Sequence, residues 1–336
     1  MAKQKTMSEK AKTEFRRFVN NMSCPTLEKV GRNLTLMYLD GKLDPCYHRE
    51  VPITSIQKIL LRKSKPNVLL TGPAGCGKTA IAEGVAAVLA ERAIKQTGQE
   101  IIAEEAYKKA WNAWDKARRM SAWDDDEDFT EPEPIRTEVP KAFLSNCVVY
   151  DVPLTALVGG TKYRGDLEER IGELLNECRR YPNIVLFIDE IHQIISAGHS
   201  DGGEGVAQML KPALSRCDIR VIGATTTDEA KLLMKDKALA RRFNEVEITP
   251  LCGNAAMETA DGILADYAKH HGIRYETDVE LIMANLSTFL PKSVFPDNFI
   301  NVVDETLAGC KFDGKECATT ADFNATLSRM AGVVIV

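Results

Sequence analysis

The sequence lacks the apolar runs, cysteine pairs and basic stripes that identify several large classes of protein. No apolar run approaches the length that crosses a membrane, and the polar stretch Met1–Lys12 contains no apolar core of a secretory signal. The nine cysteines are dispersed, without a C-x-x-C pair or zinc-like spacing, which favours free thiols in a reducing cytoplasm. At a net charge of −5 no basic stripe stands out, which argues against nucleic acid as the main partner.

The pattern that is present is that of a soluble α/β protein with room for two domains. Short apolar runs alternate with helical patterns, which predicts a doubly wound parallel sheet. The strand candidates are residues 67–71, 147–151, 184–188, 219–224 and 245–248. After Pro250 the strand signal ends, and residues 254–330 carry helical patterns. We therefore expect a polar, amphipathic extension over 1–24, an α/β domain over 25–250 and a small all-helical domain over 251–336.

Two helices are predicted before the first strand candidate. Residues 13–22 carry apolar side chains at helical spacing beside two arginines, which is typical of a short amphipathic helix. Another helix is expected to start at Pro25 and to close at Gly41, with Leu27, Leu34 and other apolar residues on one face.

A complete phosphate-binding loop follows the strand candidate 67–71. Its residues, in the pattern G-x-x-x-x-G-K-T, are Gly72, Pro73, Ala74, Gly75, Cys76, Gly77, Lys78 and Thr79. Strand, loop and the helical pattern at 80–90 form the arrangement that the motif needs, because glycines turn N–H groups toward an anion at a helix N-terminus. We expect Lys78 to contact the β- and γ-phosphates of ATP and Thr79 to bind Mg²⁺. The alternative, a turn that binds nothing, is disfavoured by the Lys-Thr pair at this spacing.

Two adjacent carboxylates end the buried strand candidate 184–188. Asp189 and Glu190 are costly at such a place unless a charged group lies nearby, and Mg²⁺ with a nucleotide is the obvious partner. Asp189 would hold the metal, and Glu190 would orient and polarise the attacking water. Read alone, the pair could equally be an acidic N-cap for a helix beginning near Ile191. Together with the phosphate loop, the catalytic interpretation dominates.

Several further motifs occur in one order from Pro25 to Val336, apart from about 95–145. They are residues 24–35, 41–45, 160–170, 209–214, 223–226, 240–243 and 295–297. In this set and order the chain resembles the Clp-type AAA+ unfoldases, in particular their first ATPase module. The resemblance implies a P-loop α/β fold with a small helical lid, ATP and Mg²⁺ as cofactors, and a homo-hexameric ring that threads polypeptide substrates through a central pore.

The resemblance also implies roles for individual residues. The sensor that hydrogen-bonds the γ-phosphate or the attacking water would be Thr226, with Thr225 as the alternative, and the arginine fingers would be Arg241 and Arg242. The substrate-gripping pore loop would contain Lys162, Tyr163 and Arg164. Nucleotide contacts would come from Cys46, Tyr47 and Asp297. Without the resemblance these would be ordinary strand-end threonines and a solvated arginine pair. A core position suits Tyr163 poorly, because charges and glycines flank it.

The chain departs from the family pattern at several places. His48 stands where the adenine-contacting turn usually has glycine, which puts base selectivity in doubt, and Asn298 stands where lysine is usual. No I-G-F or I-G-L tripeptide is found, so docking of a peptidase is not expected. The chain is expected to be either a stand-alone single-ring ATPase or a piece of a longer protein.

The segment at about 95–145 is expected to be an insertion on the surface. A long helix over 100–122 carries Tyr107, Trp111 and Trp114, and an acidic run follows Trp123. Such a stripe is more often local packing than a binding face, but it is the candidate site for an adaptor. The alternative function is accordingly an ATP-dependent interaction protein whose nucleotide state controls assembly without threading. A DNA-remodelling ATPase is disfavoured by the acidic balance.

Overall fold

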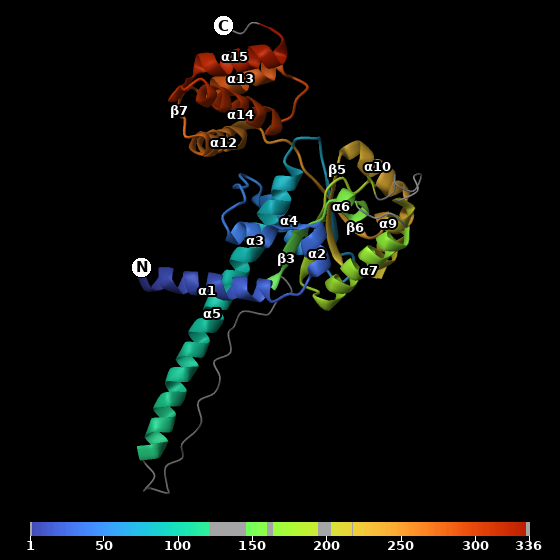
Figure 1. The fold of residues 1–336 in the computed structure, drawn as a ribbon, viewed down its shortest axis with the longest axis vertical. Coiled ribbons are helices and arrows are strands. Elements are labelled where there is room, and N and C mark those ends of the chain that lie inside the picture. Colours follow the sequence, from blue (N-terminus) through green and yellow to red (C-terminus); the bar gives the residue numbers. More distant parts are fainter. Residues whose placement is uncertain (1, 121–145, 160–163, 194–202, 217, 334–336) are drawn as a thin grey trace. The chain divides into compact units, whose positions relative to one another are not determined.

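The computed structural model describes residues 2–120, 146–159, 164–193, 203–216 and 218–333 (Figure 1). They divide into two compact units. The first contains Met1–Leu43, Val85–Leu186 and Asp218–Arg220, and the second contains Asp44–Gly84, Phe187–Cys217 and Val221–Val336. None of the described helices combines the length and the apolar character needed to cross a bilayer.

The structure contains the parallel strands that were expected from the sequence, in the order β4 (Ile184–Ile188), β5 (Arg220–Thr225), β2 (Asn67–Thr71) and β6 (Phe243–Glu247). Strands β2 and β6 lie wholly in the second unit, which also contains the ends of β4 and β5. Strand β2 pairs in parallel with both neighbours, so that Val68 lies opposite Ile222 on one side and Asn244 on the other. Every residue of β2 and β4 is buried, as their unbroken apolar runs predict. The strand predictions at 67–71 and 184–188 are confirmed residue for residue.

Helices follow the strands of this unit and then form a group of their own. The helices beside the sheet are α4 (Glu50–Leu60), α9 (Gly203–Arg216), α10 (Thr227–Lys235) and α11 (Lys237–Ala240). The lid group is α12 (Gly253–His271), α13 (Val279–Phe289), α14 (Asp297–Phe312) and α15 (Thr320–Ala331), packed around a core that includes Leu264, Phe299 and Phe323. This confirms a helical region after the sheet. It also contains two short parallel strands that were not expected, β7 (Arg274–Glu276) and β8 (Cys317–Thr319).

The first unit begins with α1 (Ala2–Asn20), which is longer than the amphipathic helix expected at 13–22. The single helix expected after Pro25 is wrong: α2 (Pro25–Val30) and α3 (Leu34–Leu39) are separated by β1 (Arg32–Asn33). Strand β1 pairs antiparallel with β3 (Val148–Asp151), and Arg32 forms an ion pair of 2.5 Å with Asp151. This partner lies over a hundred residues away, so local helical spacing could not reveal it. Strand β3 neighbours β4, and α6 (Leu154–Val158) and α7 (Arg164–Arg180) lie between them in the chain.

Helix α5 (Lys78–Met120) starts at the phosphate loop and continues without a break for 43 residues. Two helices, at 80–90 and 100–122, were expected here, and this separation is wrong. Gly98 does not end the helix, and a β-carbon at this glycine would lie 3.6 Å from the Ala11 methyl group, an ordinary van der Waals contact. The near half is buried through Ile81, Val85 and Leu89, whereas Trp111 in the far half is 38% exposed.

Candidate functional site

The phosphate loop turns tightly between β2 and α5. Gly75 and Gly77 have φ angles of +77° and +90°, which L side chains rarely adopt. A β-carbon at Gly75 would also lie 2.7 Å from Cβ of Asp297, the first residue of α14. Burial raises the pKa of the Cys76 thiol, so this cysteine is a protonated filler at neutral pH. The glycines are therefore required by the backbone path and by the close approach of the lid.

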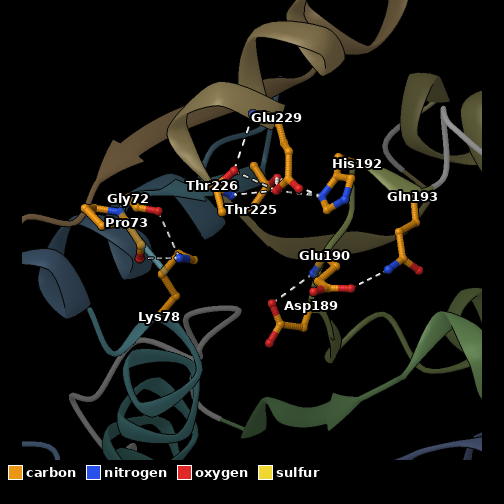
Figure 2. A network of polar contacts seen from close by, with 10 residues as sticks. All are labelled: Gly72, Pro73, Lys78, Asp189, Glu190, His192, Gln193, Thr225, Thr226 and Glu229. Atoms are coloured by element: carbon orange, nitrogen blue, oxygen red, sulfur yellow. Dashed lines mark hydrogen bonds and ion pairs between the residues drawn. The ribbon is translucent and has the colours of Figure 1, made fainter. Parts of the chain in front are cut away.

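Lys78 and Thr79 both contact residues that follow the parallel strands, and Figure 2 shows Lys78 beside Gly72 and Pro73. The Lys78 ammonium donates to the carbonyl oxygens of Gly72 at 3.0 Å and Pro73 at 2.8 Å. The Thr79 hydroxyl donates to Asp189 Oδ2 at 3.0 Å, which joins the start of α5 to the end of β4. Hydroxyl and carboxylate oxygens are the hard ligands that Mg²⁺ prefers, so this pair fits the expected metal.

Glu190 stands out by its backbone and its exposure. Its φ is +48°, a left-handed conformation that costs a non-glycine residue about 1–3 kcal/mol and occurs often at functional sites. Its N–H donates to Asp189 Oδ1 at 2.9 Å, and its carboxylate accepts a hydrogen bond from Gln193. The alternative of an acidic N-cap stays untested, because residues 194–202 lie outside the described part of the chain.

A polar network covers the end of β5, the strand beside β4. Thr226 caps α10: its hydroxyl donates to Glu229 Oε2 at 2.7 Å and accepts from the Glu229 N–H at 3.4 Å. Thr225 Oγ1 lies 3.0 Å from His192 Nδ1 and 3.3 Å from Glu229 Oε2 (Figure 2). These hydrogen bonds, led by the one from Thr226, lower the pKa of Glu229. The Thr226 hydroxyl is thus engaged in the cap, whereas Thr225 faces the segment after Glu190.

His192 and Glu229 are two members of this network that the sequence reasoning missed. The His192 ring lies 3.2 Å from Glu229 Oε2, and the neighbouring Ile191 N–H donates to Ala224 O at 3.0 Å. The segment after Asp189–Glu190 is therefore joined to β5. The spacing Thr226-x-x-Glu229 is a capping-box signature and could have identified the cap. No local signal marks His192.

Of the remaining predicted site residues, the two arginines lie in the described part of the chain and most of the pore loop does not. Arg241 is exposed and Arg242 half-buried just before β6, and no described residue forms an ion pair with either. Lys162 and Tyr163 lie outside the described residues, and α7 begins at Arg164. The expected pore loop therefore stays a prediction.

The turn that contains Cys46 and Tyr47 lies against the phosphate loop. Arg49, which was not predicted as a site residue, is 7% exposed, and its guanidinium donates to Cys76 O and Thr249 O, each at 2.8 Å. The turn, the start of α5 and apolar lid residues such as Ile263 and Ile300 enclose a pocket of about 160 Å³. This places Cys46 and Tyr47 beside an enclosed space next to the phosphate loop.

Comparison with known proteins agrees with this geometry. Residues 68–251, more than half of the chain, match the family described as "ATPase family associated with various cellular activities (AAA)". The chain is 35% identical over 287 residues to the chloroplastic chaperone protein ClpC2 of Arabidopsis thaliana, an alignment that covers 85% of this chain and 25% of that protein. It is also 35% identical over 287 residues to the ATP-dependent Clp protease ATP-binding subunit ClpL of Staphylococcus aureus, covering 84% and 34%.

Solved structures give the same result. The S. cerevisiae Hsp104–ADP complex matches with a TM-score of 0.70 and 30% identity over 92% of this chain and 46% of that chain. Hsp104 with ATPγS and FITC casein matches with a TM-score of 0.68 and 31% identity over 91% and 45%. The resemblance to Clp-type proteins is confirmed, and the chain spans about a quarter to a third of the curated relatives it matches.

Proposed function

The chain belongs to the AAA family of ATPases, and we propose that it is a Clp-type motor that couples ATP hydrolysis to the remodelling of polypeptides. The observation that carries this proposal is the junction of Lys78, Thr79 and Asp189 at one sheet edge, beside the exposed Glu190. Similarity to Clp and Hsp104 proteins, one of them solved with casein, supports polypeptide as the substrate class.

Binding of ATP is proposed to use the phosphate loop and the adjoining pocket. Backbone N–H groups of residues 74–77 and the N-terminus of α5 would surround the phosphates, with the Lys78 ammonium neutralising charge. Thr79 and Asp189 would hold Mg²⁺, which when bound neutralises charge on the phosphate oxygens. Cys46 and Tyr47 would border the base, and Asp297 would bring the lid to Gly75.

Hydrolysis is proposed to use Glu190 as the general base. Its carboxylate takes a proton from water while the water oxygen bonds to the γ-phosphorus and the bond to the bridging oxygen breaks, which leaves ADP and phosphate. A strand-end threonine would orient the water or the γ-phosphate. Arg241 and Arg242 would reach the nucleotide of a neighbouring copy, since guanidinium groups remain charged and match phosphate oxygens.

Ring formation and threading are the finer parts of the proposal. A homo-hexamer would place Lys162, Tyr163 and Arg164 at a central pore, where an aromatic ring can grip polypeptide of any sequence. The proposed boundaries are an extension over 1–24, an ATPase domain over 25–250 and a lid over 251–336.

One experiment tests threading directly. Casein-stimulated ATPase activity and unfolding of a tagged fluorescent protein are measured for the parent and for Tyr163→Ala, with negative-stain images taken with and without ATP. We expect ATP-dependent rings, near-parental basal ATPase activity in the variant, and loss of stimulation and unfolding. Equal unfolding by both proteins would exclude the pore-loop role.

The second candidate function is an ATP-dependent interaction protein, and the far half of α5 favours it. The rings of Tyr107, Trp111 and Trp114 lie in tilted contact along this helix, with centroids 6.1 and 5.1 Å apart, and Ile102 is 54% exposed. An adaptor could bind this stripe, since aromatic side chains supply large contact areas. If neither the parent nor Tyr163→Ala unfolds the substrate while rings still form with ATP, this second function is favoured.

A further inference from the structure

Three consecutive side chains of the turn Asp44–Arg49 connect the phosphate loop to the lid. Arg49 bonds to Cys76 O and to Thr249 O, just before α12. The Tyr47 hydroxyl donates to Asp266 Oδ2 at 2.8 Å, and His48 Nε2 lies 2.9 Å from Glu258 Oε2. Both carboxylates belong to α12, so one short turn holds the loop and the first lid helix together.

The Tyr47 ring lies directly on Gly262, in the middle of α12. A β-carbon at this glycine would stand 2.6 Å from Tyr47 Cζ and 2.9 Å from Cε1, closer than atoms can pack. Glycine is unfavourable inside a helix, so a helix of ordinary composition would carry another residue here. The close approach of the tyrosine ring is a physical reason for the glycine.

His48 adds to this contact through an unusual backbone. Its φ is +52°, in the left-handed region where the resembling family usually has glycine. The side chain that replaces glycine reaches Glu258, but both groups are well exposed, and exposed ion pairs contribute little. Tyr47, with its packed ring and its bond to a carboxylate, therefore carries most of the contact.

The same turn borders the pocket beside the phosphate loop. Tyr47 and Cys46 lie on one side, and lid residues including Thr259, Ile263 and Asp266 lie on another. A molecule in this pocket would be bordered by the turn on one side and by α12 on another. Movement of α12 away from the turn would widen the pocket, and that movement requires the contact of Tyr47 with Gly262 and Asp266 to break.

We propose that Tyr47, packed on Gly262 and hydrogen-bonded to Asp266, is a positioning residue that holds α12 over the pocket and sets the rate at which ADP is released. We call this contact the Tyr47 latch. It rests on the proposed nucleotide site and adds a residue that controls product release. The side chains of this turn thus contact α12 as well as bordering the pocket.

Gly262→Ala tests the latch without altering a residue that borders the pocket. The added methyl group displaces the Tyr47 ring, while alanine suits the helix better than glycine, so α12 keeps its fold. Gly309→Ala in α14 is the matched control, because no atom lies within 4 Å of its β-carbon position. Release of a fluorescent ADP analogue from the full chain is measured by stopped flow, with excess ADP as the competitor.

We expect Gly262→Ala and Asp266→Asn to release the analogue about tenfold faster than the parent, and Gly309→Ala to stay within about twofold of it. Amide exchange over residues 44–49 in the nucleotide-free protein should also increase only in the first two variants. Parental release rates in Gly262→Ala overturn the latch and leave the nucleotide site standing. If the parent binds no analogue, the nucleotide site fails too, and amide exchange still decides whether Tyr47 holds α12.

Discussion

The ends of β4 and β5 lie side by side, but polar groups stay exposed after β4, whereas those after β5 are hydrogen-bonded to one another. After β4, the carboxylate of Glu190 is exposed on a left-handed backbone, and Asp189 bonds a hydroxyl from the phosphate loop. After β5, Thr225, Thr226 and Glu229 are bonded to one another and to His192. An exposed carboxylate has lone pairs free to accept a ligand. A network whose polar groups are bonded to one another instead fixes the backbone around the site.

The energetically unfavourable features of the proposed site are found at only one of the two strand ends. The unusual φ and the adjacent carboxylates concentrate at the end of β4, which an ATP-bound cation would stabilise. At its described residues, the end of β5 has no such strained backbone or paired carboxylates. Its capping box fixes the start of α10 to the end of β5. Substitution of Glu190 should therefore affect turnover, whereas at the end of β5 the substitution of Thr226 should affect stability, and Thr225 is the residue there whose loss should affect turnover.

The largest expected loss of ATPase turnover comes from removing the two arginines that precede β6, outside both strand ends. Alanine at Arg241 and Arg242 should leave nucleotide binding intact and lower turnover about 10³–10⁵-fold, the usual contribution of an arginine finger. Mixing this variant with Lys78→Ala should recover part of the activity, since each copy provides what the other lacks. Full hydrolysis by a dilute, demonstrably monomeric sample would rule out a role in trans.

The next effect isolates the end of β4. Glu190→Gln should lower the turnover number about 10²–10⁴-fold while ATP binding persists, because Lys78, Thr79 and Asp189 remain. Lys78→Ala should instead lose binding. Equilibrium titration with a fluorescent ATP analogue and a phosphate-release assay distinguish the two. Parental hydrolysis by the glutamine variant would show that Glu190 is not the base.

Two adjacent substitutions sharpen the comparison at the end of β5. Thr225→Ala should lower turnover about 10–150-fold if its hydroxyl bonds a charged phosphate or the water. Thr226→Ala should mainly lower the free energy of unfolding, by about 0.5–2 kcal/mol, because it removes a helix cap. Both are followed by ATPase kinetics and urea denaturation. The reverse pattern would assign the sensor role to Thr226, as the family resemblance implies.

The smallest effect concerns pH. The pKa of Glu229 is lowered in the folded state, so its contribution to stability is present above the unfolded-state pKa near 4.5 and is lost as pH falls through the folded value. Glu229→Gln should therefore flatten the decline of Tm as the pH falls below about 4.5. Asp228→Asn gives the comparison with a surface carboxylate: its hydrogen bond to Lys231 also lowers the pKa of Asp228, but exposed ion pairs contribute little to stability, so a smaller change is expected. Identical Tm profiles for the parent and Glu229→Gln would contradict the network's role.

The sequence predicted those parts of the site that depend on local pattern. The phosphate loop and the strands at 67–71 and 184–188 have unbroken apolar runs and glycines at fixed spacing, which act over a few residues. The capping box Thr226-x-x-Glu229 is an equally local pattern, because its two residues bond within one helical turn. Arg49 and His192 could not be found in this way, because their partners lie on other segments.

The errors in the fold have the same physical origin. Strand β1 interrupts a helical pattern because it pairs with β3, and β7 forms because it pairs with β8, far along the chain. Helix α5 shows the opposite case. Two separate helices were expected at 80–90 and 100–122, but the residues between them continue the helix, because the one glycine there, Gly98, costs only about 1 kcal/mol, which the good helix formers on both sides offset.

The continuity of α5 also has a mechanical consequence. At 1.5 Å per residue its 43 residues make a rod of about 65 Å, whose first turn is part of the phosphate loop. A rotation of one degree at Lys78 would move the far end by about 1.1 Å, and a few degrees would move it by a side-chain diameter. At Trp111, about 50 Å from Lys78, the same rotation would give a displacement of about 0.9 Å per degree, so the unbroken helix would act as a lever that enlarges small changes in direction at its first turn.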